Sequence, residues 1–337
     1  MKSKWNKTCH LSARQRVLGA LGAFALAVTF GAGRSLAEDS SSKIARIIVP
    51  FAPGAAVDVV ARMLAGPLSA QWGKSVIVEN RPGGSTLIAA EAVARSEPDG
   101  ATLLFCLDDT FTIVPHLSKP GTFDPMKELV PINLIGTIPM AFVVNPSLSV
   151  DSVPALVAYA RSHPSALSYG SSGVGSLPNL AMEVLKSQAK INMVHVPYRG
   201  LAPVQTAVLA GEVQTAILGY GSSRSMIEAK RLRIIAIASA ARVASLPNVP
   251  TTAEAGYPRV DATSHLALAG PVRMSMEIIG RVNDAVSRAL NTPEIRKQIE
   301  ARDIVVTDMG PNSFAEEIKR LSRLNAEAVQ ISGAKPE

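Results

Sequence analysis

The chain has 337 residues, of which 47% are hydrophobic and 4% aromatic, and its formal net charge is +7. Six lysines and arginines and no acidic residue lie within positions 1–37, so the rest of the chain carries a charge near +1. A nearly neutral body with few aromatic side chains argues against a nucleic acid as partner. A body of about 300 residues is typical of two domains rather than one core.

The first 37 residues have the three parts of a secretory signal peptide. Basic residues between Lys2 and Arg16 precede an apolar run from Val17 to Phe30, and Ser35-Leu36-Ala37 follows as a small-x-small cleavage site. The apolar run is too short for a helix that spans a bilayer. We therefore predict cleavage after Ala37 and a periplasmic location; an uncleaved anchor is the alternative.

A single cysteine, Cys106, lies beyond the predicted cleavage site. Without a second cysteine the exported chain cannot form an internal disulfide, so packing alone must stabilise it. Because Cys106 ends the apolar run that starts at Thr102, we expect a buried and unreactive thiol.

Beyond the signal peptide, short apolar runs alternate with helical patterns. Strands are predicted at Ile47–Val49, Val76–Glu79, Thr102–Cys106, Ala141–Asn145, Met193–Val196, Thr215–Leu218, Ile234–Ser239 and Ile304–Thr307. Helices are predicted at Val57–Gln71, Thr86–Arg95, Pro154–Arg161, Pro178–Gln188 and Met274–Leu290, and a last helix at a capping box, Ser313–Glu316. This alternation predicts an α/β fold with mainly parallel sheets flanked by helices.

Three loops rich in small residues lie at predicted strand-to-helix junctions. They are Pro53–Ala56 with Asp58 close behind, Tyr169–Ser176, and Pro197–Pro203, which contains Tyr198. Ligands of parallel α/β sheets collect at the carboxyl ends of strands, where helix N-termini offer unpaired N–H groups and a positive dipole end. Each loop could therefore hold an anion with its backbone amides, and hydroxyl groups would add specificity.

Asp108 and Asp109 follow the predicted strand that ends at Cys106. Two carboxylates at such a position could contact a cationic or hydroxyl-bearing part of a ligand, and they would repel an anion placed directly against them. A solvated acidic loop is the other interpretation.

The other candidate residues also have purely structural interpretations. Asp58 can stabilise the first turn of its helix through the helix dipole. Ser176 can be an N-cap, and Tyr198 can be a packed aromatic side chain with a solvated hydroxyl. These alternatives stay open at the level of the sequence.

Motifs of common enzymes are interrupted in this sequence. Val174 stands where a nucleophile elbow needs glycine, and Pro178 stands where a dinucleotide fingerprint needs its third glycine. His116, His163, His195 and His265 show no metal-ligand spacing. We expect no metal and no cofactor, although a Ser–His–Asp triad stays open because such triads are recognised by geometry.

Several short motifs follow one another along the chain. They are Val49–Gly54 with Asp58, Val78–Gly84, Pro98–Gly100, Tyr169–Gly173, His195–Gly200, and Leu246–Thr251 with Glu254–Gly256. Together they resemble the Bug family, the substrate-binding proteins of tripartite tricarboxylate transporters. The resemblance covers essentially the whole chain beyond the signal peptide.

The resemblance implies a two-domain periplasmic binding protein of the type II-like class with a ligand cleft between its domains. Residues 43–142 and 265–337 would form domain 1, and residues 143–264 domain 2. In the family, loop amides, hydroxyls and ordered waters hold a ligand carboxylate. The positions that carry over as ligand-binding candidates are Phe51, Ala55, Ala56, Asp58, Ser172, Ser176 and Tyr198.

The sequence also departs from the family pattern at several positions. Ala55-Ala56 replace a second glycine, Asp108-Asp109-Thr110 replace a loop of Ser, Thr and His, and Gln214, Gly219-Tyr220 and His265 replace an Asp, an Asp-Asn pair and a Trp. We interpret these as ligand-facing positions and add Asp109, Thr110 and Tyr220 to the candidates. The hypothesis is a ligand with one carboxylate and a polar, cationic or aromatic remainder rather than an ordinary dicarboxylate.

The predicted function is a monomeric periplasmic solute-binding protein that is not an enzyme. It would capture a small carboxylate-bearing metabolite for the membrane permease of a tripartite tricarboxylate-type transporter. One alternative is a periplasmic hydrolase or transferase that uses Ser172 or Ser176 with a histidine. Another is a receptor that reports ligand occupancy to a signalling partner.

Overall fold

The strands form two sheets in the computed structural model, which describes residues 44–119, 121 and 123–335. The predicted signal peptide, residues 1–37, lies outside the described residues. The strands are β1 (Ile44–Val49), β2 (Ser75–Asn80), β3 (Thr102–Leu107), β4 (Leu129–Ile138), β5 (Met140–Val144), β6 (Ser168–Ser171), β7 (Val194–Pro197), β8 (Thr215–Gly219), β9 (Arg233–Ile237), β10 (Ser264–Pro271) and β11 (Val305–Met309).

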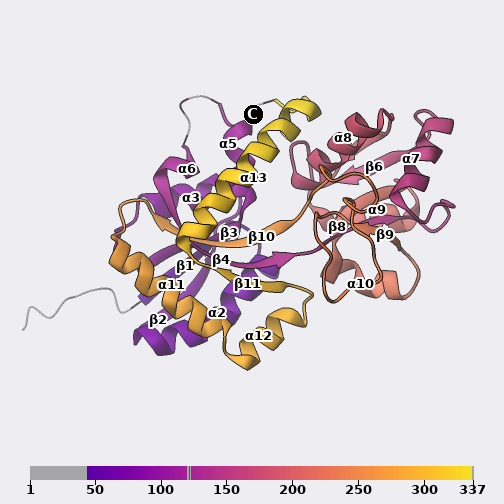
Figure 1. Ribbon diagram of the computed structural model, residues 1–337. Coiled ribbons are helices and arrows are strands. Elements are labelled where there is room, and N and C mark those ends of the chain that lie inside the picture. Colours follow the sequence, from indigo (N-terminus) through magenta and orange to yellow (C-terminus); the bar gives the residue numbers. More distant parts are fainter. Residues whose placement is uncertain (1–43, 120, 122, 336–337) are drawn as a thin grey trace, which may run out of the picture. The chain divides into compact units, whose positions relative to one another are not determined.

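Helices connect the strands and flank both sheets (Figure 1). They are α2 (Ala56–Trp72), the 3-10 turn η1 (Gly84–Thr86), α3 (Leu87–Ala94), α4 (Asp109–Thr112), α5 (Val114–Leu117), α6 (Pro125–Glu128), α7 (Val153–Ser162), α8 (Leu177–Ala189), α9 (Leu201–Ala210), α10 (Tyr220–Glu228), α11 (Met276–Leu290), α12 (Pro293–Glu300) and α13 (Pro311–Ser332).

The first sheet, called sheet A, has six strands in the order β11-β4-β10-β3-β1-β2. β1 is parallel to β2 and β3, whereas β10 is antiparallel to β3 and β4, and β11 is antiparallel to β4. The second, sheet B, has the order β7-β6-β8-β5-β9. β6 is parallel to β7 and β8, and β5 is antiparallel to β8 and β9.

The α/β class and the two helix-flanked sheets are confirmed, but both sheets are mixed rather than mainly parallel. The difference arises where the chain passes between the sheets. β5 follows β4 across the single residue Pro139, and β10 returns from sheet B to sheet A. A strand that enters a sheet at the edge where its neighbours end must run antiparallel to them.

Each sheet buries side chains on both faces because successive residues of a strand point to opposite sides. In β1, Ile47 and Val49 pack with α2, α11 and α12, whereas Ile48 packs with α3 and α13. In β5, Phe142 and Val144 face α7 and α8, and the alternate residues face α9. At about 1.5–3 kcal/mol for each large apolar side chain buried, these layers stabilise the fold without a disulfide.

The expectation for Cys106 is met within this core. Its side chain is fully buried among residues of β3, α3 and β10, and it is a free cysteine. Burial raises the pKa of the Cys106 thiol well above its usual range, so the reactive thiolate is not available.

Three strands lie outside the predicted set: β4, β6 and β10. β4 contains Pro131 and Asn133, and its pairing with β10 has two register shifts, so neither strand shows a clean period of two. β6 has the sequence SYGS, which is too short and too polar to look like a strand. The predicted strands and helices elsewhere are present with ends that differ by a few residues.

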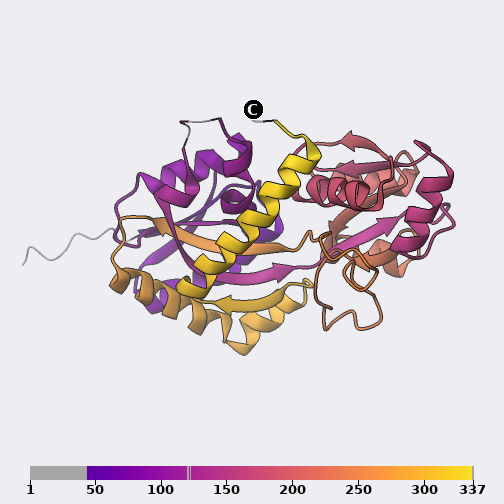
Figure 2. The same ribbon diagram turned by 45° about the horizontal axis from the view of Figure 1, so that its top comes forward.

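The predicted capping box at Ser313–Glu316 is wrong. Helix α13 begins at Pro311 and its N-cap is Gly310, so Ser313 lies inside the first turn. Proline is favoured at the first helical position because its missing N–H would have no partner there. From this start α13 contacts α4 and β4, and its later part packs on α8 (Figure 2).

The described residues from Ile44 onward belong to one compact unit that carries both sheets. Sheet A takes its strands from residues 44–138 and 264–309, and sheet B from 140–237. The division into domains of residues 43–142 plus 265–337 and 143–264 remains a prediction, and its first boundary falls inside β5. Among the helices of the described part, none is both long and apolar enough to cross a membrane.

Candidate functional site

All ten predicted ligand-binding residues lie in the loops or first helical turns that follow the carboxyl ends of strands. Four lie after β1, two after β3, two after β6, one after β7 and one at the end of β8. Because β1 and β3 are parallel neighbours, their carboxyl ends share one edge of sheet A, and those of β6, β7 and β8 share one edge of sheet B. The sequence therefore places the candidates on two sheet edges.

The two edges meet at Pro139. β4 ends at Ile138, on the edge of sheet A where β1 and β3 end, and β5 starts at Met140, paired with Gly219 at the end of β8. The Pro139 carbonyl also accepts a hydrogen bond of 2.9 Å from the Tyr220 N–H. Strand ends that converge at such a crossing are the places where ligands of open α/β sheets bind.

The junction between β1 and α2 is organised by Asp58. Its carboxylate accepts hydrogen bonds from the Gly54 N–H at 2.9 Å and from Asn80 Nδ2 at 2.8 Å, and it pairs with Arg62 at 2.9 Å. Gly54 has φ +88°, a left-handed conformation that favours glycine. Asp58 thus fastens the loop to the following helix and to the end of β2.

These partners decide the charge state of Asp58. Burial alone would raise its pKa, but the hydrogen bonds from Arg62, Gly54 and Asn80 outweigh burial and lower the pKa. Because Asp58 is 2% exposed and its oxygens are used inside the protein, its contribution is to position the loop. Asp58 therefore does more than stabilise the helix dipole, and its buried, hydrogen-bonded oxygens do not favour direct contact between Asp58 and a ligand.

The rest of this loop presents backbone rather than side chains. Ala56 is exposed and Ala55 is half-buried, while the Phe51 ring packs against the core and the Phe51 carbonyl accepts from Asn80. The first helical bond runs from the Val59 N–H to the Ala55 carbonyl. The N–H groups of the preceding turn therefore lie at the positive end of the helix dipole, where an anion is stabilised.

The junction after β3 holds a buried contact between Asp108 and His265. Asp108 is 3% exposed and accepts from the His265 backbone N–H at 2.8 Å, while its other oxygen lies 3.1 Å from His265 Nδ1. Burial alone would lower the pKa of His265, but the Asp108 carboxylate outweighs burial and the pKa is raised. The interpretation of this segment as a solvated acidic loop is therefore wrong for Asp108.

Asp109 and Thr110 begin helix α4 at the same junction. The Thr110 hydroxyl donates to Thr86 Oγ1 at 3.0 Å, which fastens α4 to the loop after β2. Asp109 Oδ1 is buried and has no hydrogen-bond partner among the described residues. Burial and the charge of Asp108 raise the pKa of Asp109 to about 7, against the opposing effect of the Thr110 N–H.

In sheet B, the loop after β6 makes its own network. Ser176 donates to the Gly173 carbonyl at 2.7 Å, so it occupies the N-cap position of α8 without capping it through its side chain. The Ser172 side chain is half-buried, and no hydrogen bond of its hydroxyl occurs in the described part. Gly175 packs on Leu117 so closely that a methyl group there would overlap it.

Ser171 and His195 form the closest serine–histidine pair of this region, 2.7 Å apart. The Ser171 hydroxyl also donates to the Gly173 carbonyl at 2.9 Å, so it can only accept from His195 Nε2, and Ser171 is fully buried. Burial lowers the pKa of His195. Ser172 and Ser176 make no hydrogen bond to a histidine within the described ranges, so the geometry for activating either serine is missing.

The two tyrosine candidates pack their rings against the same core cluster of sheet B. Tyr220 is 7% exposed, Tyr198 is half-buried, and burial raises the pKa of both hydroxyls. Tyr198 lies beside Gly170, where a methyl group would contact its ring. Both side chains therefore have a packing role, as one interpretation held for Tyr198, and only their edges remain for a ligand.

A pocket of about 320 Å³ joins the loops of the two sheets. Its walls include Gly84 and Ser85 after β2, Leu117 of α5 and Val174 of the loop after β6. None of the ten candidates lines it, although Ser172 and Ser176 flank Val174. Ser85 and Thr86 have positive φ values of 49° and 78°, so this loop stores strain beside the pocket.

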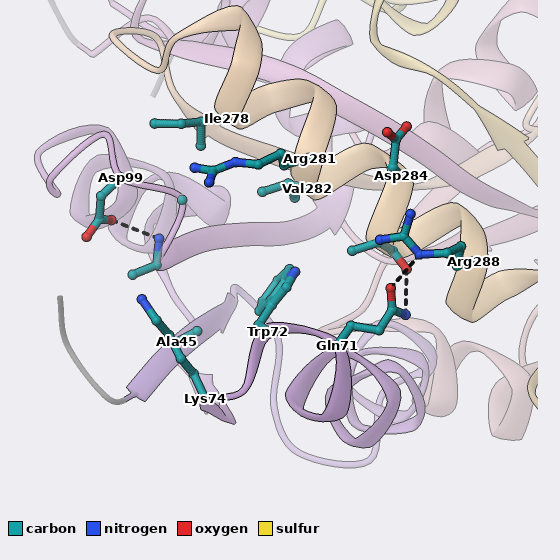
Figure 3. Close-up of a pocket in the computed structure, with 13 residues that line it drawn as sticks. Ala45, Gln71, Trp72, Lys74, Asp99, Ile278, Arg281, Val282, Asp284 and Arg288 are labelled. Atoms are coloured by element: carbon teal, nitrogen blue, oxygen red, sulfur yellow. Dashed lines mark hydrogen bonds between the residues drawn. The ribbon is translucent and has the colours of Figure 1, made fainter. Parts of the chain in front are cut away.

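A larger pocket, of about 450 Å³, lies at the opposite edge of sheet A. Figure 3 shows Trp72, Arg281 and Arg288 around it, with Gln71 accepting from Arg288 at 2.9 Å and donating to the Ala285 carbonyl at 3.0 Å. It lies where β1 and β3 begin, since Ala45 and Ala101 line it. None of the predicted site residues lies there.

The structure places Gln214 differently from the sequence interpretation. Gln214 precedes β8. Its side chain accepts from the Ser168 N–H at 2.9 Å and donates to the Gly211 carbonyl at 3.3 Å. It therefore lies at the edge of sheet B away from the candidates, and its interpretation as a ligand-facing residue is wrong.

Thr86 is a residue of the candidate binding edge that the sequence predicted only as a helix start. The run Gly83-Gly84-Ser85-Thr86 after β2 resembles the loop after β1 in composition and is the signal that could have identified it.

The converging edges bring together hydrogen-bond donors and one open acceptor. Helix N-termini, hydroxyls and one unpaired carboxyl group surround the converging edges, and no cluster of three or more His, Cys, Asp or Glu that could hold a metal occurs among the residues that the structure describes. Such an environment suits reversible binding of a small polar anion.

Solved structures of similar fold include a periplasmic transporter and a protein with bound adipate. A structure described as a periplasmic transporter is 31% identical with a TM-score of 0.76, covering 88% of this chain and 99% of that one. A protein of R. palustris solved with adipate is 28% identical with a TM-score of 0.76, covering 87% and 98%. The fold and the converging edges therefore define a solute-binding protein of the periplasmic type.

The sequence comparisons specify the family. The model of the tripartite tricarboxylate transporter family receptor, TctC, matches residues 60–332. Protein BugT of Bordetella pertussis is 32% identical over 327 residues, which are 95% of this chain and 98% of BugT. The chain belongs to the TctC family of transporter receptors, as the Bug resemblance predicted.

Proposed function

We propose that this protein captures a small carboxylate-bearing metabolite between the converging edges of sheets A and B and delivers it to the permease of a tripartite tricarboxylate-type transporter. The observation that carries the proposal is the convergence at Pro139 of strand ends that lead into helix N-termini and include the unpaired Asp109 Oδ1. The adipate found with the R. palustris relative supports a carboxylate as the ligand class.

The proposed ligand contacts differ in kind along the two edges. The first turn of α2, which begins at Ala56 after the N-cap Ala55, supplies amides and a positive dipole end for the carboxylate. Ser172 supplies a hydroxyl from sheet B. Asp58 positions the first loop, and Thr110 fixes α4 against Thr86, so both act through the groups that they hold.

The proposal includes export. Removal of residues 1–37 would leave a mature monomer that begins at Glu38 in the periplasm. N-terminal sequencing of protein from the periplasmic fraction tests this part; a chain that retains Met1 in the membrane fraction contradicts it.

Binding is tested with protein from which co-purified ligand has been removed by unfolding and refolding. Thermal-shift and calorimetric titrations would use mono-, di- and tricarboxylates, amino acids and aromatic acids. A ligand at 100 times its dissociation constant stabilises the folded state by about 2.7 kcal/mol, which is readily measured. No stabilisation by any of these compounds contradicts the proposal.

Matched serine variants locate the site. Ser172→Ala removes a hydroxyl at the proposed edge and is expected to weaken binding about fivefold to tenfold, as for one lost hydrogen bond. Ser162→Ala removes an exposed hydroxyl on α7 and should leave the affinity unchanged. Covalent labelling of either variant or of the wild type by a fluorophosphonate probe would favour a hydrolase instead.

A further inference from the structure

One polar group on the proposed binding edge is left without a partner. Asp109 Oδ1 is buried at the start of α4 and accepts no hydrogen bond from any described residue. A buried acceptor without a partner costs about 1–3 kcal/mol, and more if it is charged. Proteins keep such groups rarely, so this one calls for a physical explanation.

The surroundings of Asp109 show why no protein group satisfies it. The neighbouring Asp108 already takes both the backbone N–H and the ring nitrogen of His265. The hydroxyl of Thr110 is turned to Thr86. The donors of His265 and the hydroxyl of Thr110 are thus used by other residues, and Asp109 Oδ1 stays open as an acceptor.

Charges around the junction set what can approach Asp109. Asp108 and the Cys106 thiol lie on its own segment, His265 faces them from β10, and Glu317 of α13 and Asp261 act on His265. The ring of His265 is held by Asp108, so any positive charge that it carries is matched by that carboxylate. A ligand carboxylate placed against Asp109 would meet repulsion unless one of the two were protonated.

We propose that Asp109 is a specificity-determining residue that accepts a hydrogen bond from a hydroxyl or ammonium group of the ligand, so that the protein selects hydroxy- or amino-substituted carboxylates over unsubstituted ones. This inference rests on the proposed function, because it assumes that the ligand carboxylate lies at the first turn of α2. β3 and β1 are neighbours in sheet A, so the two junctions lie side by side (Figure 1).

The test uses two matched ligand series and isothermal titration calorimetry. Succinate, malate and aspartate share one skeleton and differ only in the group at one carbon; butyrate, 2-hydroxybutyrate and 2-aminobutyrate form the same series with one carboxylate. In one series at least, a substituted member should bind about tenfold or more tightly than the unsubstituted acid, as expected for a hydrogen bond to a charged group. Asp109→Asn should reduce that preference to about threefold or less.

Proton exchange distinguishes direct contact from a structural role. Because the pKa of Asp109 is raised to about 7, an ammonium group that binds it drives off its proton. Titrations at pH 7 in buffers of different ionisation enthalpy should show proton release for the amino acid, and its affinity should rise from pH 6 to pH 8. An unsubstituted diacid that bound against Asp109 would take up a proton instead. Asp109→Asn should abolish the release.

The controls separate failure of the inference from failure of the function. Asp284→Asn makes the same chemical change on an exposed residue of α11 and should alter neither preference nor proton release. Equal or tighter binding of the unsubstituted acids, unchanged preference in a folded Asp109→Asn variant, or binding only of carboxylates outside both series overturns the inference and leaves the function. Failure of every carboxylate to bind the wild type overturns the function and the inference with it.

Discussion

The aspartates after β1 and β3 lie at neighbouring junctions of the same sheet edge but are held very differently. Asp58 accepts from Gly54, Asn80 and Arg62, and its pKa is lowered. Asp109 has an oxygen without any partner in the described chain, and its pKa is raised to about 7. The same residue type therefore shapes the backbone at one junction and leaves an open acceptor at the other.

The largest expected effect concerns Asp58. Asp58→Ala leaves the Gly54 N–H and the Asn80 amide without an acceptor and Arg62 without its carboxylate. We expect a loss of about 3 kcal/mol in the free energy of unfolding, since hydrogen bonds to charged groups contribute about 1.5–3 kcal/mol each. Urea denaturation measures the loss. Asp284→Ala, a change on the surface of α11, should stay within about 0.5 kcal/mol; a similar value for Asp58→Ala would erase the contrast between the junctions.

The next effect is the pH dependence of stability at Asp109. The folded-state pKa of Asp109 is raised to about 7 from its usual value of 3.8, so as pH rises the unfolded chain ionises first and the folded state loses stability. Asp109→Asn removes this loss. A shift of this size corresponds to about 4 kcal/mol if it is fully expressed. Because the Asp109 residue is half-buried, solvent screening reduces it. We expect nearly equal stability of the two proteins near pH 4 and an advantage of about 2 kcal/mol for Asp109→Asn at pH 8. Denaturant titrations at both pH values measure it, and parallel pH profiles would show that Asp109 is not perturbed.

The smallest expected effect on stability sharpens what the first loop does. Ala55 has extended backbone angles (φ −62°, ψ 154°) at the N-cap of α2. Ala55→Gly removes a methyl group beside the first-turn amides and should lower the free energy of unfolding by less than about 1 kcal/mol. It should nevertheless change ligand affinity or preference in calorimetric titrations. If binding is unchanged, the loop after β1 is only a scaffold and the carboxylate lies elsewhere.

Individual helices and strands show which parts of the fold local sequence patterns predict. Helix α2 was predicted from Val57, Val60, Ala61 and Leu64, because their spacing places them on one face of a helix. All four are buried in the structure. β4 and β10 were missed because Pro131, Asn133 and two register shifts break the period of two. Their antiparallel pairing depends on partners about 130 positions apart along the chain, which no local pattern contains.

For the candidate site, the sequence was informative about position and less so about role. Small residues after strands identified the junctions at Gly54, Ser172 and Tyr198, because only small side chains leave backbone amides open. It did not show that the carboxylate oxygens of Asp58 are used within the protein, that Gln214 precedes β8 rather than following it, or that the Tyr220 ring packs in the core. Those roles depend on partners brought together by folding.

The sequence by itself determined the α/β class, the family and the junctions that carry the proposed site, because these follow from local patterns of apolar and small residues. Only the tertiary structure decided which carboxylates are paired. His265 and Asp108 are separated by 157 positions yet lie in contact, and their pairing is what leaves Asp109 as the open acceptor. Hydrogen-bond satisfaction is a property of three-dimensional neighbours, and the specificity proposed for this protein follows from it.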